Sequence, residues 1–184
     1  MTYLRRISRV AIVLGATVVM LALLAWSLRA LGARSAWFAL IVVWLPMTWL
    51  GTVSHIVPPR LPPWYHALRG FERDGRVYEL LGVRLCKRLL RRGPFAVFNP
   101  ALRLPSAPDP ANVARLEQSM RDAEASHVIL LVLTLAVVVH AAARGWWAAA
   151  TWTLLFDVLV NGYPVMLQRY NRALLHQRFA APAA

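Results

Sequence analysis

The sequence predicts an all-α integral membrane protein in which about four transmembrane helices form a bundle with a basic cytoplasmic loop. Of its 184 residues, 59% are hydrophobic and only 16% are charged, and its mean hydropathy is +0.49. Soluble domains usually carry about a quarter charged residues. Apolar stretches near the ~20 residues that a helix needs to cross hydrocarbon recur along the chain, and the length fits a single membrane domain over residues 1–184.

Two spans are predicted in the first third of the chain. Residues 10–28 follow a basic segment and are long enough to cross a membrane, although a cleaved signal peptide is the alternative interpretation. Residues 36–57 form the second span. Pro46 lies inside it and should kink the helix, because proline cannot donate a backbone hydrogen bond.

Two further spans are predicted after a long polar loop over residues 58–126. Asp109 and Pro110 are typical of an N-cap and a first helical residue, so a helix should begin there and continue to about Ala143. Its later part, residues 127–143, is the third span. The fourth span, residues 146–167, should be interrupted near Asn161 and Pro164.

The distribution of positive charge predicts the orientation of the chain. Eighteen of the 21 lysine and arginine residues precede the first span, follow the fourth or lie in the long loop, and only Arg29, Arg34 and Arg144 fall on the other side. The positive-inside rule then places both termini and the loop in the cytoplasm, in a cell-membrane protein. The same distribution favours membrane lipids over nucleic acid as the partner of the net charge of +13.

The loop is expected to contain an amphipathic helix that lies in the lipid headgroup region. Over residues 77–92, Val77, Leu81, Leu85 and Leu89 share one stripe, and basic residues lie mostly elsewhere. The single cysteine, Cys86, excludes an intramolecular disulfide and a multi-cysteine metal site.

Glu124 and His127 form the first candidate for catalysis. Their i, i+3 spacing lets both face the same way on a helix, and a carboxylate beside an imidazole can orient the ring and strengthen it as a general base. A polar pair that only caps the membrane end of the helix is the alternative. Glu-x-x-His also occurs in di-iron bundles, but those need a second such motif, so no metal is expected.

Span four carries two other candidate features. Asp157 lies deep in the span, where an ionisable group is costly and is either functional or held by buried polar neighbours. The string Gln168-Arg169-Tyr170-Asn171-Arg172 is dense in hydrogen-bond donors. It could anchor the helix at the headgroups, or its arginines could bind a phosphate through forked hydrogen bonds.

Several of these residues together resemble a known family. Gly75, Tyr78-Glu79, Gly82-Val83-Arg84, Lys87, Glu124-x-x-His127, Asn161 and the string from Gln168 to Arg172 occur in this order. In order and spacing they resemble the small membrane-bound glycosyl-4,4'-diaponeurosporenoate acyltransferases of staphyloxanthin-type carotenoid biosynthesis. The resemblance covers roughly residues 50–175.

The resemblance implies transfer of a fatty acyl group from acyl-CoA, or a similar thioester, to a hydroxyl of a glycosylated lipid or carotenoid, with no bound cofactor. His127 would be the base and Glu124 would orient it. Arg169 and Arg172 would bind the donor, Gln168 would belong to the same binding string, and Asn171 or Asn161 would stabilise the oxyanion. The alternative function is a non-catalytic partner or scaffold in a lipid pathway.

Overall fold

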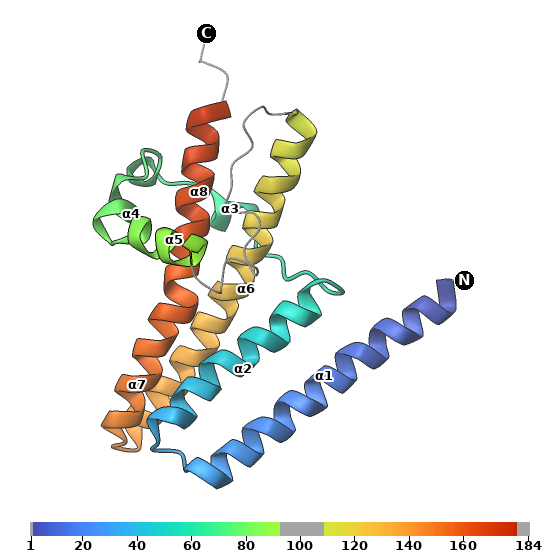
Figure 1. The fold of residues 1–184 in the computed structure, drawn as a ribbon, viewed down its shortest axis with the longest axis vertical. Helices are drawn as coiled ribbons and strands as arrows, with labels where there is room; N and C mark the ends of the chain where they lie inside the picture. The colour runs from blue at the N-terminus through green and yellow to red at the C-terminus, as the bar shows by residue number, and fades with distance from the viewer. Residues whose placement is uncertain (1, 93–108, 180–184) are drawn as a thin grey trace. The chain divides into compact units, whose positions relative to one another are not determined.

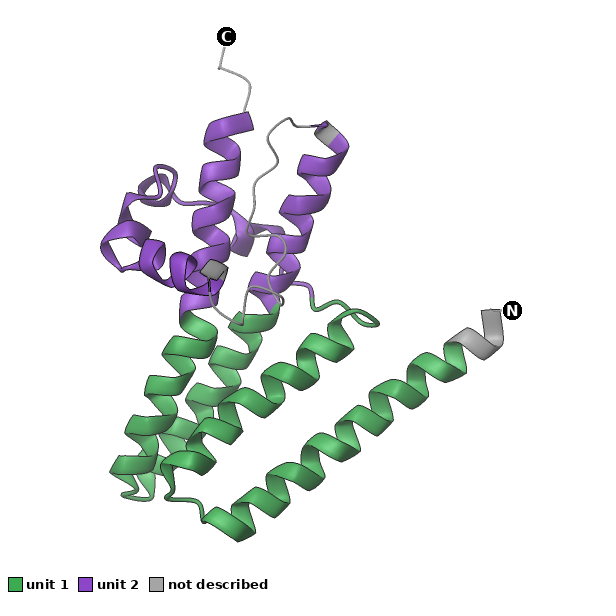
Figure 2. Cartoon of the chain, viewed as in Figure 1, with its two compact units in different colours: residues 1–59, 126–162 green, residues 60–125, 163–184 purple. Residues whose placement is uncertain are grey.

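The computed structural model describes residues 2–92 and 109–179, and every regular element in this part of the chain is helical. The all-α membrane fold is therefore confirmed. The chain divides into two compact units, residues 1–59 with 126–162 and residues 60–125 with 163–184 (Figure 2). The elements, shown in Figure 1, are α1 (Thr2–Leu31), α2 (Ala36–Ser54), α3 (Pro63–His66), η1 (Gly70–Glu72), α4 (Arg76–Leu80), α5 (Val83–Arg92), α6 (Pro110–Ala143), α7 (Trp147–Asp157), η4 (Val158–Gly162) and α8 (Tyr163–Phe179).

Unit 1 contains the hydrophobic helices: α1, α2, the second half of α6, α7 and η4. Four helices of the described chain are long and apolar enough to cross a membrane, within Arg6–Leu31, Ala36–Ser54, Ala111–Ala143 and Trp147–Phe179. Helix α2 packs against both α1 and α7. Ser35 caps α2 by accepting a hydrogen bond from the Trp37 backbone N–H, and the helix ends at Ser54, before the expected residue 57.

The expected interruption of the fourth span is a change of helix type. Residues Val158–Gly162 form a π-helical turn between α7 and α8. Because Pro164 cannot donate to a carbonyl of the preceding turn, a wider turn with an extra residue accommodates it without ending the helix. The helix then continues beyond residue 167, the expected end of the span, to Phe179.

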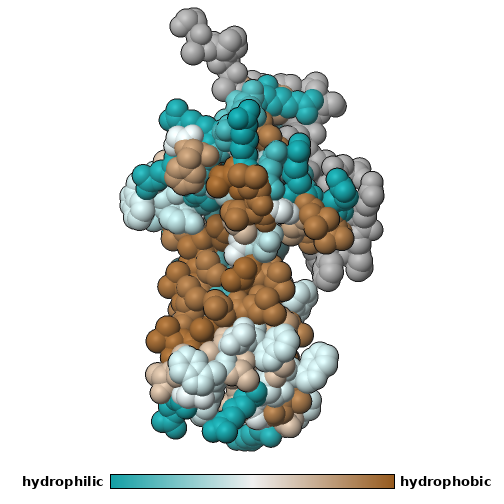
Figure 3. All heavy atoms as spheres, turned by 90° about the vertical axis from the view of Figure 1, so that its left-hand side faces the viewer, coloured by the Kyte–Doolittle hydropathy of each residue, from teal (hydrophilic) through white to brown (hydrophobic). Residues whose placement is uncertain are grey.

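The surface of unit 1 suits a lipid environment. Its helices expose large hydrophobic side chains such as Val18, Val139 and Leu159, and space-filling atoms over this unit form a broad hydrophobic surface (Figure 3). Where α6 turns into α7, the Trp146 ring lies 5.6 Å from the Arg34 guanidinium and 5.7 Å from that of Arg144. Such an aromatic and cationic cluster is typical of the end of a membrane span.

Unit 2 contains α3, η1, α4, α5, the first part of α6 and α8. Its core is formed by Tyr78, Val83, Leu167 and Tyr170. Helix α6 begins at Pro110 as expected, and the Asp109 carboxylate accepts a hydrogen bond from the Ala111 backbone N–H.

The amphipathic helix expected over residues 77–92 is two helices. Gly82 has a φ of +78° and separates α4 from α5, because a left-handed residue cannot continue an α-helix. Leu81, Leu85 and Leu89 are exposed, as an interfacial helix requires. Val77, expected on the same stripe, packs against the core instead.

Candidate functional site

Arg169, on α8, is held by acceptors from four other segments of unit 2. Its Nε donates to Glu72 Oε1 at 2.7 Å and its Nη2 to Glu72 Oε2 at 2.8 Å, as a forked pair. Its Nη1 donates to Glu124 Oε1 at 2.7 Å and to the Tyr65 carbonyl, and Nη2 also donates to the Ala67 carbonyl. These bonds use all five N–H groups of the guanidinium, so none remains for a phosphate in this arrangement.

Glu124 is completely buried and serves as counter-ion to two arginines. Its Oε2 lies 2.9 Å from Arg172 Nη2, an ion pair without hydrogen-bond alignment, and 3.4 Å from His66 Nδ1. Arg172 is also fully buried, and its Nη1 donates to the His66 carbonyl at 2.6 Å. The carboxylate expected to orient His127 is therefore engaged by Arg169, Arg172 and His66.

Glu72 and Tyr78 complete the charged cluster. The Tyr78 hydroxyl donates to Glu72 Oε1, and the Arg69 backbone N–H donates to Oε2 at 2.6 Å. Burial alone would raise the pKa of Glu72, but the hydrogen bonds from Arg169, Tyr78 and Arg69 lower it to about 2. Burial and the neighbouring Glu72 raise the pKa of Tyr78 above its usual range. Glu72 is therefore a carboxylate and Tyr78 a neutral phenol at physiological pH.

Inside unit 2, the residues from Gly75 to Lys87 contact the string from Gln168 to Arg172. Tyr170 donates to Glu79 Oε1 at 2.9 Å, and Lys87 donates to Asn171 Oδ1 at 2.6 Å. Gly75 has a φ of +73°, and a Cβ built on it would lie 3.0 Å from the Tyr170 ring. The residues from Gly75 to Lys87 thus hold the string from Gln168 to Arg172 in place.

His127 belongs to unit 1, where it contacts the π-helical turn. Its Nδ1 lies 3.1 Å from Asn161 Oδ1, and Asn161 Nδ2 donates to Asp157 Oδ1 at 2.7 Å. Asn161 and Asp157 are completely buried, whereas the His127 side chain is only partly covered. His127 therefore has an amide as its partner where a carboxylate was expected.

The predicted site residues thus fall into two groups. Arg169, Asn171, Arg172 and Glu124 form bonds within unit 2, while His127 and Asn161 are paired within unit 1. Gln168 is half-buried, and among the described residues its amide has no hydrogen-bond partner. The catalytic and binding roles of these residues remain predictions, but Arg169 and Glu124 also have a structural role that the sequence did not indicate.

The sequence interpretation did not include Glu72 or His66 and treated Asp157 as an open case. The scarcity of acidic residues was an available signal, because only eight aspartates and glutamates accompany 21 lysines and arginines. A buried carboxylate in such a chain has many cationic side chains as possible partners. Which of them it meets depends on contacts between α8 and segments about 45–105 residues away.

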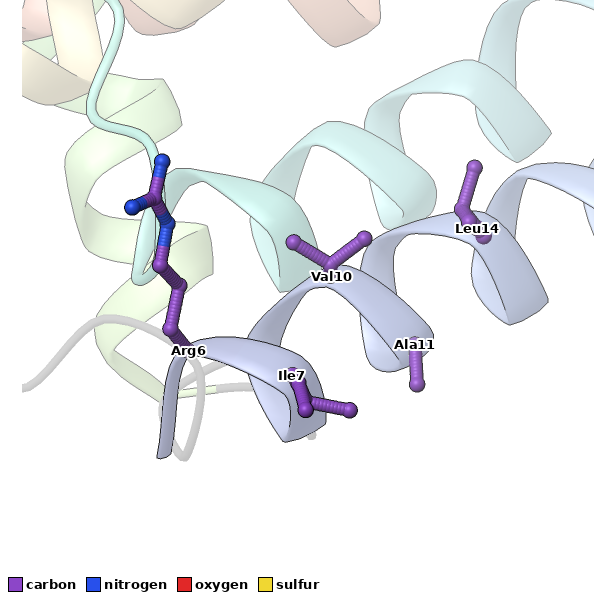
Figure 4. A pocket seen from close by; sticks show the side chains of 5 residues that line it. All are labelled: Arg6, Ile7, Val10, Ala11 and Leu14. Carbon is purple, nitrogen blue, oxygen red and sulfur yellow. The ribbon is translucent and has the colours of Figure 1, made fainter. Parts of the chain in front are cut away.

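Neither a metal-binding group nor a hollow suited to acyl transfer is found among the described residues. No group of three or more histidine, cysteine, aspartate or glutamate side chains is placed there to hold a metal ion. A hollow of about 440 Å³ lies along α1, lined by Arg6, Ile7, Val10, Ala11 and Leu14 (Figure 4). Apart from Arg6 its lining is apolar, so it lacks groups for acyl-transfer chemistry.

The fold and the polar clusters define a helical membrane protein with buried ionisable groups on two of its spanning helices. A family model described as CrtO, glycosyl-4,4'-diaponeurosporenoate acyltransferase, matches residues 62–180. The chain belongs to this family, and it is an acyltransferase of carotenoid biosynthesis. No curated protein and no solved structure matches the chain.

Proposed function

We propose that this protein transfers a fatty acyl group from an acyl thioester to a sugar hydroxyl of a glycosylated carotenoid or a related glycolipid. The observation that carries the proposal is the family match over residues 62–180, a range that contains both the His127 segment and the string from Gln168 to Arg172. The family assignment also favours an enzyme over the non-catalytic scaffold. The reaction is assigned to the cytoplasmic face of the cell membrane, where the charge distribution places residues 58–126.

His127 is the general base in this proposal. A sugar hydroxyl is a weak nucleophile until its proton is removed, and a positioned base typically contributes ~10²–10⁴-fold to the rate. His127 takes the hydroxyl proton as the oxygen attacks the acyl carbonyl. The carbon–sulfur bond then breaks, the ester forms, and the departing thiolate accepts the proton.

The motif residues of unit 2 have a different role in the revised mechanism. Arg169 donates hydrogen bonds to Glu124 and to the backbone carbonyls of Tyr65 and Ala67, so this ion pair stabilises the fold of the unit. Gln168 has no hydrogen-bond partner among the described residues and is assigned to substrate binding. No cofactor is required, because the thioester already supplies the activated acyl group.

The test compares His127→Ala with His140→Ala, since both residues lie on α6 but His140 is exposed and its ring lies beside that of Trp146. Isolated membranes containing each variant are given acyl-CoA and a glycosylated carotenoid, and the acyl ester is measured. We expect His127→Ala to lose conversion and His140→Ala to retain it, at equal protein levels. Full conversion by His127→Ala would remove the base assignment. Absence of ester with the wild type, on any glycosylated carotenoid or glycolipid, would refute the acceptor class.

A further inference from the structure

The polar contacts inside unit 1 form a chain that ends at a histidine nitrogen. Asp157 and Asn161 are completely buried between hydrophobic helices, and Asn161 bridges Asp157 to His127. Burying a carboxylate and an amide at the depth of a membrane span is costly, and an ionisable group at that depth is a candidate for a functional site. Thr134 is a second buried polar neighbour of Asp157, but Oδ2 has no aligned hydrogen-bond partner among the described residues, so the carboxyl group is only partly satisfied.

The direction of each hydrogen bond follows from donor and acceptor chemistry. In the structure the NH₂ of Asn161 faces Asp157 Oδ1, which accepts its hydrogen bond when the carboxyl group is ionised or carries its proton on Oδ2. The oxygen of the same amide must then face His127, and an amide oxygen can only accept. His127 Nδ1, 3.1 Å from that oxygen, must therefore carry a hydrogen.

We propose that Asp157 and Asn161 are positioning residues that hold neutral His127 as its Nδ1–H tautomer, which leaves the lone pair on Nε2 as the base. Asp157 selects the rotamer of the Asn161 amide, and the amide selects the tautomer of the ring. This inference rests on the proposed function of His127 for its catalytic meaning, but the tautomer itself does not.

The π-helical turn supplies the geometric reason for this arrangement. Asn161 lies within Val158–Gly162, four residues after Asp157, where the wider turn accommodates an extra residue. Its side chain donates back to Asp157 on the preceding turn and presents its oxygen to α6. Single π-helical turns inside α-helices are frequent at functional sites.

The tautomer can be measured on the intact protein without an activity assay. The chain has five histidines, so the His127 signals are assigned by comparing ¹⁵N-histidine-labelled wild type with His127→Gln. We expect Nδ1 to show the shift of a protonated ring nitrogen and Nε2 that of an unprotonated one in the neutral ring. In Asn161→Leu the preference for Nδ1–H should be lost. A wild-type ring protonated at Nε2 alone, or an unchanged preference in Asn161→Leu, would overturn the proposal.

A second measurement separates positioning from general stability. Asp157→Leu, which removes the acceptor that faces the Asn161 NH₂, should lower kcat by roughly 10-fold or more, up to the ~10²–10⁴-fold contribution of a general base, with KM little changed. Thr153→Val, a buried polar change one turn earlier on α7, is the matched control and should leave kcat unchanged. Equal effects of the two substitutions would show that Asp157 acts only through packing. If His127→Ala loses activity but the wild-type His127 ring is protonated at Nε2 alone, this inference is refuted and the proposed function still stands.

Discussion

Arg169 and Glu72 form a forked ion pair in which two guanidinium nitrogens, Nε and Nη2, lie 2.7 and 2.8 Å from the two carboxylate oxygens. The residues are 97 positions apart in the chain and join α8 to η1. The planar guanidinium matches the geometry of a carboxylate, which a lysine ammonium cannot do. The most distinctive string of the sequence therefore contributes to the folding of unit 2.

Arg169→Lys should destabilise the protein even though it keeps the charge. One ammonium cannot replace five directed N–H donors, and removing partners from a buried ion pair costs several kcal/mol. We expect a loss of roughly 2 kcal/mol or more in the free energy of unfolding, measured by thermal unfolding in detergent. Arg178→Lys, at an exposed position of the same helix, is the control and should unfold like the wild type. An unchanged melting temperature for Arg169→Lys would contradict the structural role.

Glu124→Gln should lower the free energy of unfolding strongly, because Glu124 is a buried counter-ion. The substitution removes the negative charge that faces Arg169 and the buried Arg172, and an uncompensated buried charge typically costs about 3–5 kcal/mol. Glu117→Gln, which loosens contacts to the more exposed Arg121 and His176, should cost under about 1 kcal/mol. Chemical denaturation of both variants in detergent provides the comparison, and equal midpoints would contradict the counter-ion role.

Gly75→Ala should destabilise unit 2 by roughly 1–2 kcal/mol, because a left-handed backbone disfavours any Cβ. The added methyl would also approach the Tyr170 ring to 3.0 Å. Gly70→Ala is the matched control, since its Cβ would meet nothing within 4 Å and the backbone there is not left-handed. Melting temperatures of the two variants test the expectation. A larger effect at Gly70 would contradict it.

Glu72 should make stability depend on pH in the acidic range. Its pKa in the folded protein is about 2, below its ordinary value of 4.5. The contribution is present above pH 4.5 and is lost as pH falls from 4.5 towards 2, with a size on the order of 3 kcal/mol. Unfolding midpoints measured across this window should fall in the wild type. They should change less in Glu72→Gln, while Asp74→Asn, at an exposed carboxylate, should behave like the wild type.

The orientation expected from the positive charges can be tested with single cysteines in a Cys86→Ser background. Asp74→Cys lies in the basic loop and Arg144→Cys in the turn between α6 and α7, and both positions are exposed. A membrane-impermeant thiol reagent added to intact cells should label position 144 and spare position 74. The reverse pattern would place unit 2 outside, away from cytosolic acyl donors.

Much of the fold could be predicted because the bilayer imposes simple constraints. A helix must be about 20 apolar residues long to cross hydrocarbon, and this length recurs four times in the sequence. Asp109 and Pro110 marked the start of α6 because capping is a local interaction. The break of the amphipathic segment at Gly82 was harder to predict, because glycine adopts helical and left-handed backbone conformations about equally readily, and the φ of +78° is known only from the folded chain.

The sequence by itself determined that this is a helical membrane protein and which family its motif residues resemble, and its charges predict an orientation. Only the tertiary structure decided which partner each ionisable side chain takes. Glu124 and His127 are three residues apart, yet the carboxylate forms ion pairs with two arginines and the imidazole contacts the Asn161 amide. The length of a hydrophobic segment and the number of basic residues beside it are properties of continuous stretches of chain, so they can be predicted from the sequence. Hydrogen bonds require two atoms within about 3 Å, and chain segments far apart in sequence meet at that distance only in the folded protein.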